Sequence, residues 1–210
     1  MIRNSFLLIA AATLGLAACG SDDIDSDEEA RRAYFGLDES IGKSLTLGFA
    51  GFSSASSANI MPQMDTGEVA GTLVITGQVD QGSSSNKGMR LRVAMVDYTD
   101  GPLIVVNEDG KEEELDVDIT YDTSTDVAQQ PFLDLKLQNF PSGTLEGTLT
   151  GTYLMTGDIE GETTLSLTFS GTTMPDGSGR PTGVVRVPGS TTVTGTATSG
   201  DGTFEVNLKL

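Results

Sequence analysis

The side chains that most enzymes use for proton transfer or metal binding are scarce in this chain. Its 210 residues include no histidine and a single cysteine, Cys19. Without histidine the sequence cannot form a Ser-His-Asp triad or a Cys-His pair, and it lacks the ligands of almost every kind of zinc site. It also contains no glycine-rich phosphate loop ending in Lys and Ser or Thr, and no dinucleotide-binding fingerprint. The sequence therefore predicts a non-catalytic protein that carries no cofactor.

Carboxylates are the one abundant group with chemical potential, because the chain has 30 Asp and Glu residues. In a set of that size some pair falls at a catalytic spacing by chance, so their number does not favour carboxylate-pair catalysis. Oxygen-rich turns at 97–101, 107–110 and 176–179 could supply ligands for calcium, which takes about six to eight oxygens. None follows a known calcium-loop pattern, and Asp, Asn and Gly are ordinary turn formers. We expect no metal site.

The N-terminal segment has the features of an export signal. Arg3 precedes an apolar run from Phe6 to Ala18, and this run ends in small residues before Cys19. The run is shorter than the ~20 residues that span a bilayer, and its basic start and small-residue end are typical of a cleaved signal. The final residues, Leu16-Ala-Ala-Cys19, resemble the lipobox of bacterial lipoproteins.

This resemblance implies that residues 1–18 are a signal peptide and that Cys19 is lipidated and becomes the first residue of the mature protein. An ordinary secretory signal with a chance cysteine is the alternative, but the only cysteine of an exported chain would then have no disulfide partner. Several acyl chains on one residue give stable anchoring. In bacterial lipoproteins, Asp directly after the lipidated cysteine implies retention at the inner membrane. Here this residue is Gly20, which favours the outer membrane as the location within the cell envelope.

The charge of the chain restricts its partners. The formal net charge is −18, and the loss of Arg3 with the signal peptide would make it −19. Such a surface repels phosphate backbones, so we expect no nucleic-acid binding. Anionic lipid headgroups are repelled in the same way, which leaves the lipid on Cys19 as the predicted membrane contact.

Residues 19–26 are acidic and poor in apolar side chains, which predicts a solvated tether. Ser26 and Glu29 then match a capping box, in which Ser26 accepts a backbone N–H and Glu29 reaches back. Apolar residues recur at helical spacing from this point, and they are Ala30, Tyr34, Leu37, Ile41, Leu45, Phe49 and Phe52. Asp38, Glu39, Ser40 and Lys43 lie largely off this stripe. We predict an amphipathic helix over about 27–45, with a weaker signal towards residue 58, because four glycines each destabilise a helix by about 1 kcal/mol relative to Ala.

From residue 68 to residue 210 the apolar period changes to two, which is typical of half-buried strands. About eight or nine strands are predicted, mostly joined by short turns, as in an antiparallel meander. They cover about 69–79, 89–95, 103–106, 115–121, 133–137, 144–156, 164–169, 193–197 and 204–210. Two loop-like segments, 81–88 and 172–183, separate strands, and longer loops often carry function.

Glycines occupy several positions on the apolar side of these strands, namely Gly71, Gly77, Gly147, Gly151 and Gly195. Glycine inside a strand marks a sharp bend or the close approach of another segment. We therefore predict a single β-rich domain at 27–210, mostly β in the α+β class. Its strongly curved antiparallel sheet or barrel would pack around the N-terminal helix, with Gly151 at the closest approach. A two-layer sandwich with the helix outside is the alternative.

Two functional classes agree with these features. In the first, the chain is a non-catalytic envelope lipoprotein, a binding or structural module whose surface engages a protein or a polysaccharide. In the second, it carries a lipid or another hydrophobic ligand in a pocket between the helix and the curved sheet. An interior filled by side chains would favour the first class. The sequence assigns no residue to a ligand-binding site in either class.

Overall fold

The computed structural model describes residues 23–106, 112–115 and 117–210. In these residues the helix α1 (Asp27–Ser54) comes first and is followed by the strands. These are β1 (Asn59–Thr66), β2 (Ala70–Val79), β3 (Lys87–Thr99), β4 (Leu103–Val106), β5 (Glu112–Leu115), β6 (Ile119–Asp122), β7 (Phe132–Gln138), β8 (Thr144–Gly157), β9 (Gly161–Pro175), β10 (Val184–Arg186), β11 (Thr192–Thr198) and β12 (Thr203–Lys209). The predicted mostly β (α+β) class is confirmed.

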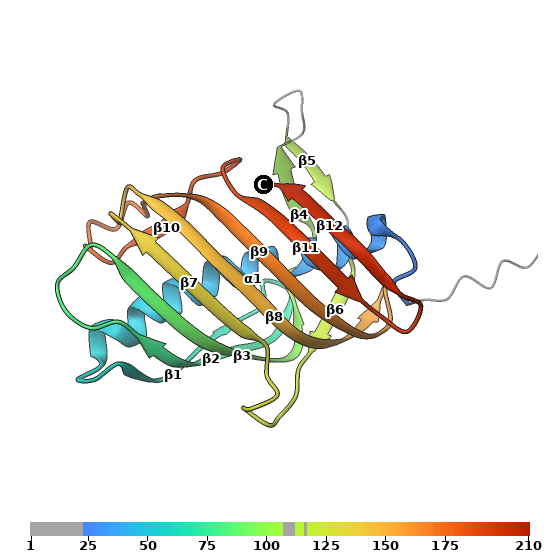
Figure 1. Ribbon diagram of the computed structural model, residues 1–210, viewed down its shortest axis with the longest axis horizontal. Helices are drawn as coiled ribbons and strands as arrows, with labels where there is room; N and C mark the ends of the chain where they lie inside the picture. The colour runs from blue at the N-terminus through green and yellow to red at the C-terminus, as the bar shows by residue number, and fades with distance from the viewer. Residues whose placement is uncertain (1–22, 107–111, 116) are drawn as a thin grey trace, which may run out of the picture.

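Ten of these strands form one antiparallel sheet that curves into a partial ring. Its main path runs β1-β2-β3-β6-β8-β9-β11-β12, and β7 lies in line with β6, between β3 and β8. In the same way β10 and β11 pair with successive parts of β9. The strands β4 and β5 form a separate hairpin that projects from the body (Figure 1).

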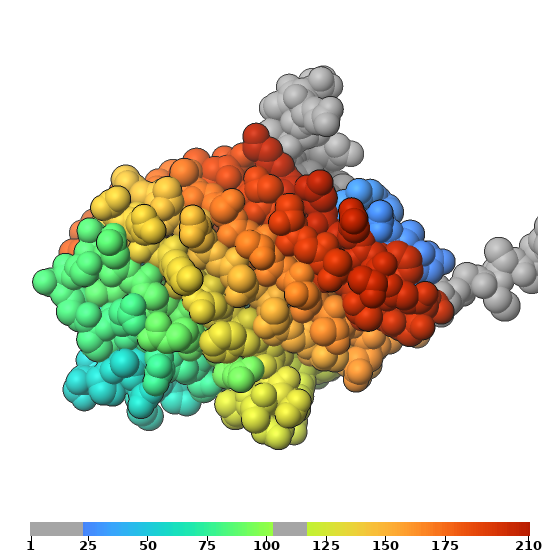
Figure 2. Space-filling model, viewed as in Figure 1, coloured from blue at the N-terminus to red at the C-terminus, as the bar shows by residue number. Residues whose placement is uncertain are grey.

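The helix lies on the concave side of the sheet, behind the strands in the view of Figure 1. It contacts both edge strands, β1 and β12, and also packs on β2, β3 and β10. The convex side of the sheet faces water and hides most of α1 in Figure 2. The prediction of a curved antiparallel sheet around an N-terminal amphipathic helix is therefore confirmed, and the sandwich with an outer helix is not what forms.

The helix begins where predicted but is longer. Ser26 accepts the Glu29 N–H at 3.3 Å, while the Glu29 carboxylate reaches back to the Asp25 N–H at 2.9 Å instead of to Ser26. The helix ends at Ser54, not near residue 45, because its apolar side remains buried to the end: Phe49 is 2% exposed. None of the described helices is long and apolar enough to cross a membrane.

The predicted strands agree with the observed ones for most of the sheet, and three segments differ. Strand β1 (Asn59–Thr66) lies before the predicted start at residue 68, since its edge position leaves most of its side chains exposed and without apolar alternation. Residues Thr172–Pro175, predicted as part of a loop, extend β9 and pair with the short strand β10. The predicted strand at 115–121 is divided between β5 and β6.

Four of the five inward glycines have positive φ, between 77° at Gly71 and 156° at Gly151, and the segments that approach them are not the helix. A Cβ on Gly151 would lie 2.4 Å from the Cα of Pro131, where the chain leaves the sheet between β6 and β7. A Cβ on Gly195 would lie 2.1 Å from the Ser166 carbonyl oxygen of the neighbouring strand. The expectation that Gly151 faces the helix is therefore wrong.

The close approach between helix and sheet occurs at glycines of the helix itself. A Cβ on Gly36 would lie 2.3 Å from Tyr121 Oη, one on Gly48 would lie 2.6 Å from Met89 Sδ, and one on Gly51 would lie 2.9 Å from Ile60. The helix propensity that these glycines lose is thus offset by close packing. The helix residues Tyr34, Leu37, Ile41, Leu45 and Phe49 and the sheet residues Leu73, Leu149 and Leu167 belong to one buried cluster, each at most 3% exposed.

Candidate functional site

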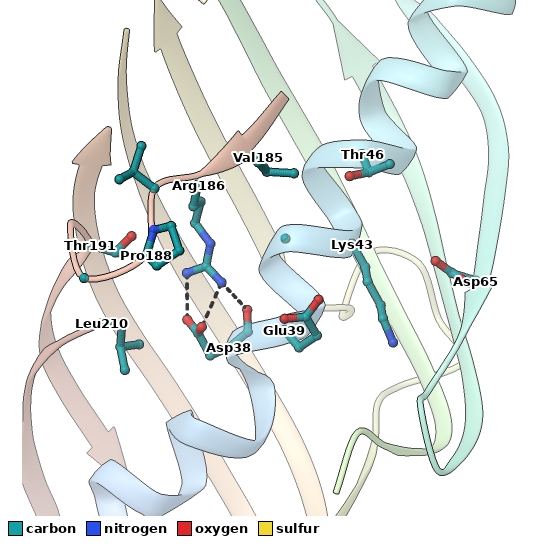
Figure 3. A pocket seen from close by; sticks show the side chains of 13 residues that line it. Asp38, Glu39, Lys43, Thr46, Asp65, Val185, Arg186, Pro188, Thr191 and Leu210 are labelled. Atoms are coloured by element: carbon teal, nitrogen blue, oxygen red, sulfur yellow. Dashed lines mark hydrogen bonds and ion pairs between the residues drawn. The ribbon is translucent and has the colours of Figure 1, made fainter. Parts of the chain in front are cut away.

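A groove of about 370 Å³ lies over the outward side of α1, on the side where the sheet does not close. The helix forms its floor, with β1 on one side and the segment that starts with β10 on the other (Figure 3). We call this feature the groove. It is lined by Asp38, Glu39, Gly42, Lys43, Thr46, Asp65, Val185, Arg186, Val187, Pro188, Gly189, Thr191 and Leu210.

The helix residues of the groove follow from its geometry. Asp38, Gly42 and Thr46 are spaced by four residues, so they lie above one another on one side of the helix, and Glu39 and Lys43 form the adjacent row. Gly42 has no side chain, so the floor of the groove is open at this position. A Cβ added there would approach Arg186 Nη2 at 3.8 Å and Glu39 Oε1 at 4.0 Å.

Arg186 of β10 forms a two-pronged ion pair with Asp38 on one wall of the groove. Its Nη1 and Nη2 donate to the two carboxylate oxygens at 2.8 and 2.7 Å, and Nη2 also donates to the Asp38 carbonyl at 2.9 Å. Tyr34 Oη donates to the same carboxylate at 2.8 Å. Burial alone would lower the pKa of Arg186, but its hydrogen bonds to Asp38 and the charge of Asp38 outweigh burial and raise it. Arg186 therefore stays charged, and its hydrogen bonds to Asp38 leave neither of its terminal nitrogens to a ligand.

Lys43 is the centre of a second charged cluster, towards the ends of β1 and β3. Its ammonium donates to Asp100 Oδ1 at 2.7 Å and to the Thr66 carbonyl at 2.9 Å, and lies 3.0 Å from Glu68 Oε1. Tyr98 Oη donates to the other oxygen of Asp100 at 2.5 Å. Burial lowers the pKa of Lys43, but Asp100 and Glu68 more than compensate and raise it. All three protons of this ammonium group thus have acceptors.

Glu39 lies between these two clusters (Figure 3). Its carboxylate has no hydrogen-bond or ion-pair partner among the described residues, and its side chain is open to water. The groove walls nevertheless remove part of its hydration, which raises its pKa; Asp100 and Asp38 raise it further, while Arg186 and Lys43 lower it. Glu39 is therefore the charge on the floor of the groove that is available to a ligand.

The residues predicted as candidates lie elsewhere or in other roles. Cys19, the predicted lipidation site, and the turn at 107–110 lie outside the described residues. In the turn at 97–101, Asp100 pairs with Lys43, and in the turn at 176–179, Asp176 Oδ1 accepts the Ser178 N–H at 2.7 Å. Within the described ranges no group of three or more His, Cys, Asp or Glu side chains is placed to hold a metal ion.

The groove itself was not predicted. The polar residues off the helix stripe, Asp38, Glu39 and Lys43, were visible in the sequence. However, Arg186, which pairs with Asp38, and Asp100, which pairs with Lys43, lie 148 and 57 residues away in the chain. Comparisons of the chain with models of protein families, with curated proteins and with solved structures gave no match.

Proposed function

We propose that this protein is a non-catalytic lipoprotein of the bacterial cell envelope, held at the outer membrane through a lipid on Cys19. Its β-rich domain is a binding module that takes its ligand in the groove. The predicted tether at 19–26 is shorter than expected, because Ile24 is fully buried in the core and its carbonyl accepts a hydrogen bond from Ser199 Oγ at 2.7 Å, which leaves only the residues before Asp23 for this role. The resemblance of residues 16–19 to a lipobox supports the anchor. The shape and charge of the groove support the binding role.

The observation that carries this proposal is the packing of α1 into the concave side of the sheet. Helix and sheet share one apolar cluster, and Tyr34, Leu37, Leu73 and Leu149 are at most 1% exposed in it. The place where a carrier would hold its cargo is thus occupied by the protein's own side chains. A recess large enough for a small ligand lies instead on the other side of the helix, since ligand pockets typically measure about 300–1,000 Å³.

The arrangement of charges in the groove favours binding over bond-breaking chemistry. Lys43 and Arg186 are each engaged with carboxylates, so neither is available as a base or as a nucleophile. The pKa values of both are raised, whereas a catalytic lysine needs a lowered one. These groups fix the walls of the groove and leave Glu39 to meet a ligand.

Phase partitioning tests the anchor. The protein expressed with its signal should enter the detergent phase, and the Cys19→Ser variant should enter the aqueous phase because a single hydroxyl side chain carries no acyl chains. A Ser21→Ala variant, which keeps the cysteine, is the matched control and should behave as the wild type. A Cys19→Ser protein that still enters the detergent phase would refute the lipoprotein assignment.

Native mass spectrometry of the protein released from its own membrane tests the binding role against the carrier alternative. The binding module should appear as the mature lipidated mass, with or without a small soluble ligand. A co-purified diacyl lipid that is lost only on unfolding would show that the helix–sheet interface opens for cargo, which contradicts the packing argument.

A further inference from the structure

The groove combines apolar walls with two unneutralised carboxylates, Glu39 on its floor and Asp65 on one wall, and this combination restricts what it can bind. Val185, Val187, Pro188 and Leu210 line it on the side of β10 and the C-terminal segment. Glu39 stands on the floor, beside the ion pair of Asp38 and Arg186 (Figure 3). A ligand that fills this volume meets hydrocarbon on one side and a carboxylate on the other.

The two basic residues of the groove do not make it a site for anions. Both terminal nitrogens of Arg186 already donate to Asp38, and the three protons of Lys43 have acceptors in Asp100, Glu68 and Thr66. An anion would have to displace these carboxylates. It would also face the negative field of a chain with a net charge of −18.

The remaining charges all favour a cation. Glu39 lacks a partner among the residues described, and Asp65 lines the opposite wall with its side chain exposed. The loss of hydration that raises the pKa of Glu39 also strengthens its attraction for an opposite charge that enters the groove. Charge complementarity thus specifies the sign of the ligand, and the walls specify an apolar body.

We propose that the groove binds a small organic cation, with its ammonium group on the Glu39 carboxylate and its apolar body against Val187, Pro188 and Leu210. This inference rests on the proposed binding role of the groove and adds the chemical class of the ligand. The ammonium group donates hydrogen bonds to a carboxylate that has none from the protein, and charge-assisted hydrogen bonds of this kind are the stronger class.

Three probes with the same ring and different charge test the proposal: cyclohexylammonium, cyclohexanol and cyclohexanecarboxylate. Each is titrated at pH 7.5 and low salt into the full mature protein in non-ionic detergent, with empty micelles as the blank. Cyclohexylammonium should bind up to about five-fold tighter than cyclohexanol, since one partly exposed ion pair contributes up to about 1 kcal/mol. The carboxylate should bind weakest.

Two variants locate the effect. Glu39→Gln keeps the size of the side chain and removes its charge, so most of the preference for the ammonium over the alcohol probe should be lost, and only the contribution of Asp65 should remain. Gly42→Leu places a side chain on the open floor and should weaken all three probes. Glu146→Gln, on the exposed outer side of β8, is the matched control and should keep the wild-type order. Thermal melts of each variant show whether it is folded.

Binding should also depend on pH. The pKa of Glu39 is raised above its ordinary value of 4.5 by burial, with further contributions from Asp100 and Asp38 against Arg186 and Lys43. As the pH falls, the Glu39 carboxylate is protonated at a higher pH than an ordinary Glu side chain, and the preference for cyclohexylammonium, present at pH 7.5, should be lost in that step. The Glu39→Gln variant should show no such transition.

The possible outcomes separate this inference from the proposed function. Equal binding of the three probes, with loss in Gly42→Leu, would keep the groove as a binding site and refute the cation. Preference for the carboxylate, or a Glu39→Gln variant with the full wild-type preference for the ammonium, would refute it as well. Failure of every probe to bind would refute both the cation and the groove, while the partitioning of the Cys19→Ser variant would still report on the anchor by itself.

Discussion

Replacing Gly36 by Ala tests how closely the helix packs against the sheet. In an exposed helix this change stabilises by about 1 kcal/mol, because Ala is the better helix former. Here the added Cβ would lie 2.3 Å from Tyr121 Oη and 3.0 Å from the ring of that residue. Tyr121 is fully buried, its ring lies 6.2 Å from that of Tyr153 in an edge-to-face contact, and its hydroxyl donates to the Ala33 carbonyl at 2.9 Å. Either the ring or the helix must move.

The expected magnitude combines three contributions. Overpacking a core typically costs about 1–3 kcal/mol. Moving Tyr121 away from Ala33 leaves a buried hydroxyl without its acceptor, which costs about 1–3 kcal/mol. The gain in helix propensity offsets about 1 kcal/mol of this total. We expect Gly36→Ala to destabilise the fold by about 3 kcal/mol, which lowers Tm by roughly 6–12 °C for a domain of this size.

Two other glycines of the same helix are internal controls. Gly42→Ala places its Cβ on the groove side at ordinary contact distance, 3.8 Å, from Arg186 Nη2, so it should stabilise by about 0.5–1 kcal/mol. Gly48→Ala meets the thioether of Met89 at 2.6 Å, and because methionine adapts its rotamers readily, the change should be nearly neutral. Urea midpoints and thermal melts of the three variants measure the order. If Gly36→Ala were as stable as Gly42→Ala, the helix would not lie against Tyr121, and the proposed filling of the sheet would fail.

Two further predictions concern stability. Arg186→Met should lower the free energy of unfolding in urea by about 3–5 kcal/mol, because it leaves the buried Asp38 carboxylate without its cation. Adding Asp38→Asn should recover part of this loss. If the effects of the two substitutions were simply additive, the two residues would not be directly coupled. Gly151→Val should destabilise by about 1–3 kcal/mol because of Pro131, whereas Thr150→Val on the exposed side should change stability by less than about 0.5 kcal/mol. A neutral Gly151→Val would show that the chain does not pass as close to this strand as described.

The amphipathic helix and most strands could be predicted because their signals are local. The spacing of Tyr34, Leu37, Ile41 and Leu45 gives the buried side of the helix whatever the partner is, and period-two alternation gives the central strands. The edge strand β1 lacks that alternation, since one of its flanks and most of its side chains meet water. The last turns of α1 were underestimated for a related reason, because Gly48 and Gly51 lower helix propensity while their benefit is a contact with distant residues.

The inward glycines show where a correct inference from sequence stops. Glycine on the apolar side of a strand does report a bend or a close approach. It does not say which segment approaches. At Gly151 that segment is Pro131, which is present because two short strands, β6 and β7, share one column of the sheet and the chain leaves the sheet between them. A break of this kind has no periodic signature.

The groove could not be predicted because its residues depend on pairings between remote parts of the chain. From the sequence, Asp38 and Lys43 are expected on the solvated side of an amphipathic helix, but both are at most 9% exposed. Their partners, Arg186 and Asp100, lie in a short strand and in a turn whose local patterns favour neither burial nor pairing. Glu39, which follows Asp38 in the sequence, is likewise an acidic residue off the apolar stripe of the helix, but its environment in the structure is different.

The incomplete closure of the sheet links these features. Between the edge strands β1 and β12 the helix takes the place of further strands, so its outward side meets residues at the ends of β1 and β3 and the segment that starts with β10. Asp38 joins the helix to β10 on one flank, and Lys43 joins it to the turns after β1 and β3 on the other. Because the two ion pairs lie on either flank, the helix surface between them is left without a covering segment. Glu39 and Gly42 occupy that surface, and the same contacts that fix the helix in the open side of the sheet therefore also produce the groove.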